Sequence, residues 1–185
     1  MKKLLLSSVA LAASFFSIST FAASDISYNW ASVQYITEDL DDADCDQDGL
    51  TLSGNYEVHD NFFALGSFTD VSGDSGCGSE TFSIGGGYKA DFSEDASYFV
   101  SLSYIDTEVD FGSSDSGLIA AIGARALFTP DLEGRISISR NTAFDGNTVL
   151  SGGVSYWFLE RLSFNGDVNL GSESSGIALG ARFDF

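Results

Sequence analysis

Apolar and polar residues alternate in short runs over most of this chain. In the run 49–59, Leu50 and Leu52 share one face, and Thr51 and Ser53 share the other. A period of two predicts β-strands rather than helices. Ten runs of strand length can be recognised: 26–37, 49–59, 62–71, 81–92, 97–106, 117–128, 132–141, 148–158, 162–171 and 176–185.

These runs have the length of strands that cross a bilayer at a tilt, which requires about 9–11 residues. One apolar and one polar face on each strand suit a closed barrel with lipid outside and polar side chains inside. The sequence therefore predicts an all-β fold, a transmembrane antiparallel up-and-down β-barrel of ten strands. Eight strands is the alternative, because one weak hairpin could instead be an extended loop.

The facing of the first and third runs is ambiguous. In the first run, Tyr28 and Trp30 share one parity, whereas Val33 and Tyr35 share the other. A β-bulge would reconcile the two parities, because it inserts one extra residue into a strand.

The connectors between the runs alternate in length. Short connectors at 59–61, 93–96, 129–131 and 159–161 interleave with longer acidic or Gly/Ser-rich ones at 38–48, 72–80, 107–116, 142–147 and 172–175. Short periplasmic turns and longer outer loops are typical of outer-membrane barrels. This arrangement places both ends of the barrel on the periplasmic side.

The N-terminus has the layout of a secretory signal. Lys2 and Lys3 precede an apolar stretch at 4–18, and residues 20–22 form a small-x-small cleavage site. The uninterrupted apolar stretch is shorter than the roughly 20 residues of a spanning helix. We therefore expect a signal peptide at 1–22, cleaved after Ala22, and a barrel domain at 23–185 in the bacterial outer membrane.

Charge limits the possible partners. The chain has 8 Lys and Arg residues against 27 Asp and Glu, for a net charge of −19. Nucleic acid is excluded as a partner, because phosphate binding requires clustered basic residues. The 20 glycines, 16 phenylalanines and single proline suit a barrel with aromatic girdles.

Several segments resemble a known family. The run 177–185 alternates and ends on an aromatic residue, so it resembles the closing strand of outer-membrane barrels, with Gly180, Phe183 and Phe185 at the family's spacing. Segments 27–30, 128–134 and 165–168 are similar to a proteobacterial branch of the small OmpA/OmpX-type barrels. The resemblance implies recognition by the barrel assembly machinery, variable surface loops and a role that differs between members.

The two cysteines, Cys45 and Cys77, lie in the first two long connectors. Both connectors are expected on the outer face, beyond the periplasm, where disulfides form and persist. An even cysteine count in an exported chain favours a Cys45–Cys77 disulfide over two free thiols.

The first long connector carries a partial calcium motif. Asp44, Asp46 and Asp48 fit the D-x-D-x-D-G opening of a calcium loop, but Asn55 stands where a closing glutamate is needed. Weak Ca²⁺ or Mg²⁺ bridging to lipopolysaccharide phosphates is therefore favoured over a specific site, and no cofactor is expected.

Charged side chains of inward parity predict an ion-pair network inside the barrel. A carboxylate buried in a narrow lumen must be paired or become neutral. Such a network would fill the lumen, whereas ion or proton conduction through it is the less favoured hypothesis. The predicted inward residues are Glu57, His59, Lys89, Asp91, Arg125, Glu133, Arg135, Asp167, Arg182 and Asp184.

No catalytic site is predicted, because the only histidine, His59, lies beside a short turn rather than among the outer loops. Two functions remain. The first is a structural or surface-interaction barrel with acidic loops. The second is a narrow passive pore or carrier for small molecules. Expected partners are outer-membrane lipid, lipopolysaccharide and the assembly machinery, with the barrel as a monomer. Residues expected to line a less polar upper lumen are Phe99, Ile105, Ile119 and Val149.

Overall fold

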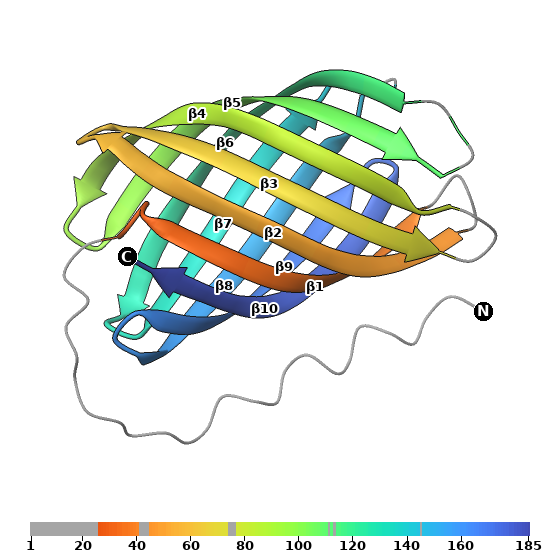
Figure 1. The fold of residues 1–185 in the computed structure, drawn as a ribbon. Helices are drawn as coiled ribbons and strands as arrows, with labels where there is room; N and C mark the ends of the chain where they lie inside the picture. The colour runs from red at the N-terminus through yellow and green to blue at the C-terminus, as the bar shows by residue number, and fades with distance from the viewer. Residues whose placement is uncertain (1–25, 41–44, 74–76, 111, 113, 145) are drawn as a thin grey trace.

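The computed structural model describes residues 26–40, 45–73, 77–110, 112, 114–144 and 146–185. The predicted signal peptide, residues 1–22, lies outside the described residues, as does Asp44. The described part forms a closed barrel of ten strands (Figure 1). They are β1 (Trp30–Leu40), β2 (Cys45–His59), β3 (Phe62–Gly73), β4 (Ser79–Ser93), β5 (Ala96–Val109), β6 (Ser114–Thr129), β7 (Leu132–Asn141), β8 (Thr148–Leu159), β9 (Leu162–Gly171) and β10 (Ser174–Asp184).

Each strand pairs with its neighbours in the sequence, and β1 pairs with β10 to close the wall. All of the pairings are antiparallel. The predicted ten-stranded up-and-down barrel is therefore confirmed, and the alternative of eight strands is wrong. In the described part of the chain, no helix is long and apolar enough to cross a membrane.

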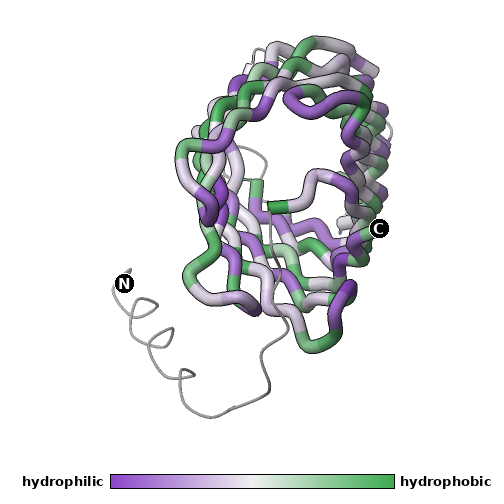
Figure 2. The backbone as a smooth tube through the Cα atoms, turned by 90° about the vertical axis from the view of Figure 1, so that its left-hand side faces the viewer, coloured by the Kyte–Doolittle hydropathy of each residue, from purple (hydrophilic) through white to green (hydrophobic). Residues whose placement is uncertain are grey.

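Apolar side chains cover the outside of the wall. Leu50 and Leu52 on β2 are each 53% exposed, and Leu179 on β10 is 63% exposed. Figure 2 shows hydrophobic and hydrophilic residues alternating along the strands. Such an extent of exposed apolar surface would drive aggregation in water. It is the outer face that a barrel presents to lipid hydrocarbon.

The two ends of the barrel differ. The turn end carries the short turns and the chain ends of the barrel, and the loop end carries the other connections (Figure 1). Strands extend further at the loop end than predicted: β1 reaches Leu40, β2 starts at Cys45 and β5 reaches Val109. Much of the predicted loops 38–48, 72–80 and 107–116 is thus strand. Hydropathy alternation fades there because both faces of the strands are polar, although backbone pairing continues.

Register shifts occur beside all four short turns, each time with the extra residue on the even-numbered strand. The extra residues are apolar and point outward, so the bulges place an apolar girdle around the turn end. By contrast, β1 and β3 contain no extra residue. The bulge suggested for the first and third runs is therefore wrong. The extra residues are Val58, Phe92, Phe128 and Phe158.

Candidate functional site

Residues 26–29, which we call the plug segment, do not belong to the wall. The wall begins at Trp30, and the plug segment turns into the lumen at the turn end. Tyr28 is 1% exposed and Ile26 is 8% exposed. Figure 2 looks into this end, where the chain bends inward from the wall before β1. Trp30, the first residue of β1, has the same parity as Tyr28, and both line a cavity inside the barrel, so the even positions of the first run face inward.

Tyr28 is the centre of an aromatic cluster inside the barrel. Its ring centroid lies 4.9 Å from that of Phe63 on β3 and 6.4 Å from that of Phe99 on β5. The Tyr28 hydroxyl is 3.2 Å from Ser97 Oγ, within hydrogen-bond distance. Phe63 is itself buried, and Ile26 packs in the same cluster. The cluster places large side chains inside the barrel near the turn end.

Two cations border the Tyr28 ring. Lys89 Nζ lies 4.9 Å and Arg125 Cζ lies 4.5 Å from its centroid. Cation–π contacts of this kind contribute about 0.5–2 kcal/mol, most where they are desolvated. Arg125 also holds the backbone, because Ser27 O accepts hydrogen bonds from Arg125 Nη1 at 2.8 Å and Arg182 Nη2 at 3.3 Å.

Glu57 on β2 contacts both the plug segment and the cation Lys89. Tyr28 N donates to Glu57 Oε1 at 3.0 Å, and Glu57 N donates to Asn29 Oδ1 at 2.8 Å. The same Glu57 oxygen lies 2.7 Å from Lys89 Nζ. The Glu57 carboxylate thus pairs with Lys89 of the wall and also accepts a hydrogen bond from the backbone of the plug segment.

The most buried ion pairs surround Glu133 on β7, which is 2% exposed. Arg125 Nε and Nη2 donate to its two carboxylate oxygens at 2.7 and 2.8 Å, a bidentate arrangement. Arg182 Nη1 lies 3.5 Å from Glu133 Oε2, and Arg182 Nε donates to Asp184 Oδ1 at 2.6 Å. Two arginines therefore share one fully enclosed carboxylate.

Another pair lies deeper in the lumen. Arg135 donates to Asp167, whose other oxygen accepts from Gln34 Nε2 at 2.7 Å. Together the ion pairs of the lumen join four cations and four carboxylates, so this half of the lumen carries no net charge. The cations are Lys89, Arg125, Arg135 and Arg182, and the carboxylates are Glu57, Glu133, Asp167 and Asp184.

Two residues of the predicted interior set are not part of these ion pairs. Asp91 and His59 are both exposed, and in the described residues neither forms an ion pair. The extra residue Val58 reverses the parity of His59, and Asp91 borders the turn-end opening. The alternation of apolar and polar residues reveals neither the bulge at Val58 nor the position of Asp91 at the opening.

Sequence reasoning missed Tyr28, Ser27 and Ser97 as site residues. The parity that Tyr28 shares with Trp30 was the available signal, because alternate residues of a strand lie on one face. Phe99 was expected in the upper lumen, yet it packs against Tyr28 near the turn end.

The half of the lumen nearer the loop end is lined mainly by small hydroxyl side chains. Serine pairs on neighbouring strands join Ser32 to Ser53 at 2.8 Å and Ser67 to Ser83 at 2.7 Å. Threonine pairs continue the pattern towards the loop end, at 2.9 Å for Thr51 with Thr69 and 3.1 Å for Thr81 with Thr107. Ile105 is buried among the inward positions of β5.

At the loop end, a disulfide joins Cys45 and Cys77. Asp46 and Asp48 lie on β2 and are exposed on its outward face, rather than in a loop that could wrap a cation. In the described part of the chain, no group of three metal-ligating side chains could hold a metal ion.

The Tyr35 hydroxyl donates a hydrogen bond to the Asp48 carboxylate across the β1–β2 pair.

The residues of the predicted assembly signal lie on and just after β10. Phe183 and Phe185 point outward and are 47% and 53% exposed. Gly180 faces inward beside β1, where a Cβ would overlap the carbonyl oxygen of Val33. Glycine at this position therefore allows the close approach of the strands that close the barrel.

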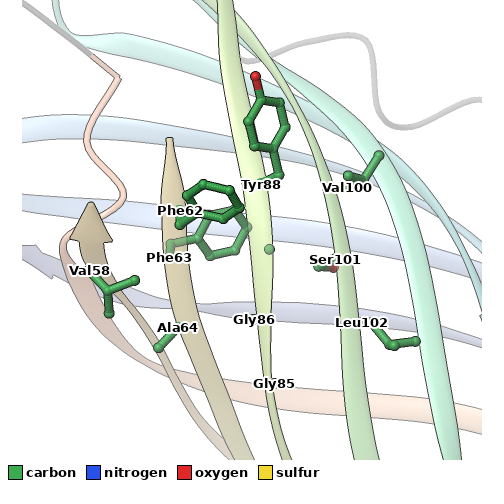
Figure 3. Close-up of a pocket in the computed structure, with 11 residues that line it drawn as sticks. Val58, Phe62, Phe63, Ala64, Gly85, Gly86, Tyr88, Val100, Ser101 and Leu102 are labelled. Carbon is green, nitrogen blue, oxygen red and sulfur yellow. The ribbon is translucent and has the colours of Figure 1, made fainter. Parts of the chain in front are cut away.

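A groove of about 600 Å³ on the outer face is separate from the lumen (Figure 3). Ala64 and Gly86 pair across β3 and β4 and form its floor, between the larger Phe62, Tyr88 and Leu102. None of its lining residues is charged. The groove is part of the apolar wall.

Comparisons with known proteins concern the fold alone. No protein-family model matches the chain, and no curated protein matches it. An outer membrane channel from Pseudomonas putida F1 is similar in structure, with a TM-score of 0.56 and 11% identity over 91% of this chain and 100% of that chain. The NanC porin has a TM-score of 0.55 and 7% identity, over 83% and 100%. The KdgM porin in complex with disordered oligogalacturonate has a TM-score of 0.50 and 13% identity, over 83% and 99%.

Proposed function

We propose that this chain is a non-enzymatic integral barrel of the bacterial outer membrane with a structural or surface-interaction role and a lumen closed to solutes. The burial of large side chains inside the barrel is the observation that carries the proposal. Tyr28 is 1% exposed, Glu133 and Arg182 are each 2% exposed, and all three lie inside the barrel. Water and ions have little room to pass where such side chains pack together.

The location is inferred from the wall. Its apolar outer face suits hydrocarbon, and its fold is shared with an outer membrane channel and porins. The turn end then faces the periplasm and the loop end faces the outside. Gly180, Phe183 and Phe185 would serve as the signal for the barrel assembly machinery, and the barrel would act as a monomer among lipid and lipopolysaccharide.

The loop end would present an acidic rim to partners. Asp46, Asp48 and Glu80 are exposed on outward positions there. As part of this surface role, Ca²⁺ or Mg²⁺ would bridge these carboxylates weakly to lipopolysaccharide phosphates, because hard cations prefer oxygen ligands.

Planar-bilayer recording tests the closed lumen. We expect purified, folded protein to give no discrete current steps at high protein load. Heat-dependent gel mobility on the same sample confirms that the protein is folded. Reproducible openings by the wild-type chain would contradict the proposal.

The second candidate function is a narrow passive pore or carrier. A cavity of about 140 Å³ inside the barrel favours it, because this space could hold a small solute. Its lining includes Arg125, Arg135 and Ser101. Uptake of a small polar solute into proteoliposomes by the wild-type chain would support this function over the first.

A further inference from the structure

We propose that the plug segment is a removable closure, and that its withdrawal opens the barrel to small solutes. This inference rests on the proposed closed lumen and identifies the part of the chain that closes it. The site is a seat for one phenolic ring, occupied by Tyr28 of the same chain.

The plug segment separates two spaces. On one side lies a pocket of about 680 Å³ at the turn end, which Ile26, Ser27 and Asn29 help to line. On the other side lies the cavity of about 140 Å³, which Tyr28 helps to line. The four consecutive residues of the segment therefore form a partition, and their removal would join the two spaces.

The barrel wall is complete without the plug segment. The pairing of β1 with β2 and with β10 starts at Trp30 and continues to Leu40. In the described residues, the backbone of the segment is joined to another backbone by the hydrogen bond from Phe185 N, just after β10, to Asn29 O at 3.1 Å. Withdrawal of Tyr28 would therefore break no ladder hydrogen bond of the wall.

The contacts of the segment resemble those of a bound ligand. A ring packs between Phe63 and Phe99 and beneath two cations, with its hydroxyl at Ser97. The ring's polar partners keep other partners after withdrawal, because Lys89 retains Glu57 and Arg125 retains Glu133. The seat can thus be emptied without leaving an unpaired buried charge, which makes withdrawal feasible.

The pathway opened in this way would be lined by both signs of charge. The four cations Lys89, Arg125, Arg135 and Arg182 remain balanced by four carboxylates. We therefore expect weak selectivity between small anions and cations.

The test compares Tyr28→Ala with Tyr98→Ala in planar bilayers, using the full chain. Tyr98 lies on β5, points outward and is 43% exposed, so it is a matched tyrosine outside the seat. We expect discrete openings from Tyr28→Ala and none from Tyr98→Ala or the wild type. Added p-cresol, the tyrosine side chain as a free molecule, should close Tyr28→Ala by refilling the seat, as small aromatics fill engineered cavities.

Each outcome has a distinct meaning. Silence of folded Tyr28→Ala, openings from Tyr98→Ala, or openings that p-cresol does not reduce would overturn the plug. Openings from the wild type would instead overturn the closed lumen itself.

A measurement on the unaltered chain covers the case in which Tyr28→Ala fails to fold. Amide hydrogen exchange at Tyr28 should be on the order of 100-fold faster than at Val33 on β1, because local opening requires less free energy than opening of the wall. Equal exchange at the two amides would show that the segment is a fixed part of the barrel and would overturn the proposal.

Discussion

The two halves of the lumen are filled by different means. Near the turn end, large aromatic and charged side chains pack across the barrel around Tyr28 and Glu133. Near the loop end, small hydroxyl groups pair along the wall, and the Cys45–Cys77 disulfide joins the start of β2 to the chain just before β4. The difference teaches that, under the proposed function, closure and stiffness would be separate tasks in this barrel. Bulky side chains and ion pairs would block passage at one end, while short hydrogen bonds and a covalent link hold the other.

The largest contrast between the halves is expected from their carboxylates. Glu133→Gln removes the partner of Arg125 and weakens that of Arg182, which leaves buried charge unpaired. We expect a loss of about 3–5 kcal/mol in the free energy of unfolding. Urea titration of the protein in lipid vesicles measures it.

The matched control lies in the other half. Glu38 accepts hydrogen bonds from Gln47 Nε2 at 3.1 Å and Ser174 Oγ at 2.7 Å, which are both neutral. We expect Glu38→Gln to cost about 1–2 kcal/mol, since only hydrogen bonds to a charged acceptor are weakened. Equal losses for Glu38→Gln and Glu133→Gln would remove the contrast between the two halves.

The disulfide should give the next largest effect, confined to the loop end. Cys45 and Cys77 are separated by 32 residues in the sequence. Replacing both by serine should cost about 3.5–4 kcal/mol, because the unfolded chain regains the freedom of a loop of that length. Unfolding of the wild type in urea, with and without reductant, also compares the chain with and without the disulfide. An unchanged midpoint after reduction would argue against this role of the bridge.

A single hydroxyl pair should contribute less. Ser67→Ala leaves Ser83 Oγ without its partner at 2.7 Å. The expected loss is about 0.5–1.5 kcal/mol, the usual value for one hydrogen bond between neutral groups. The same titration checks it. A loss as large as that of Glu133→Gln would place the hydroxyl rows on a level with the ion pairs.

The smallest effect on stability is expected from cations at the rim. Chelation of Ca²⁺ and Mg²⁺ should leave the free energy of unfolding within about 0.5 kcal/mol, as for exposed surface changes. It should nevertheless reduce co-purification with lipopolysaccharide, and Asp46→Asn with Asp48→Asn should reduce it similarly. A large fall in stability on chelation would instead indicate a specific structural metal site.

Most of the wall could be predicted from the sequence, because lipid on one side and polar atoms on the other enforce a period of two. Runs such as 162–171 and 132–141 have the same bounds as β9 and β7. The period of two stops being informative where both faces are polar, so the outer parts of β1 and β5 were placed in loops. It also cannot detect an extra residue such as Val58.

The plug segment could not be predicted from the alternation of apolar and polar residues either, but for a different reason. Whether Tyr28 continues a strand or folds into the lumen depends on partners distant in the sequence, such as Phe63, Phe99 and Arg125. Charge pairing inside the barrel was easier to foresee, since inward parity and burial require it. The choice of partners followed the tilt of the strands and could not be read from spacing.

The position of Tyr28 is the central claim, and nuclear Overhauser contacts in lipid nanodiscs or micelles test it most directly. With Tyr28 and phenylalanines selectively labelled, the claim predicts contacts from the Tyr28 ring to the rings of Phe63 and Phe99. Assignment by Phe63→Leu and Phe99→Leu should remove them one at a time. A Tyr28 ring with sharp, random-coil resonances and no such contacts would contradict the account.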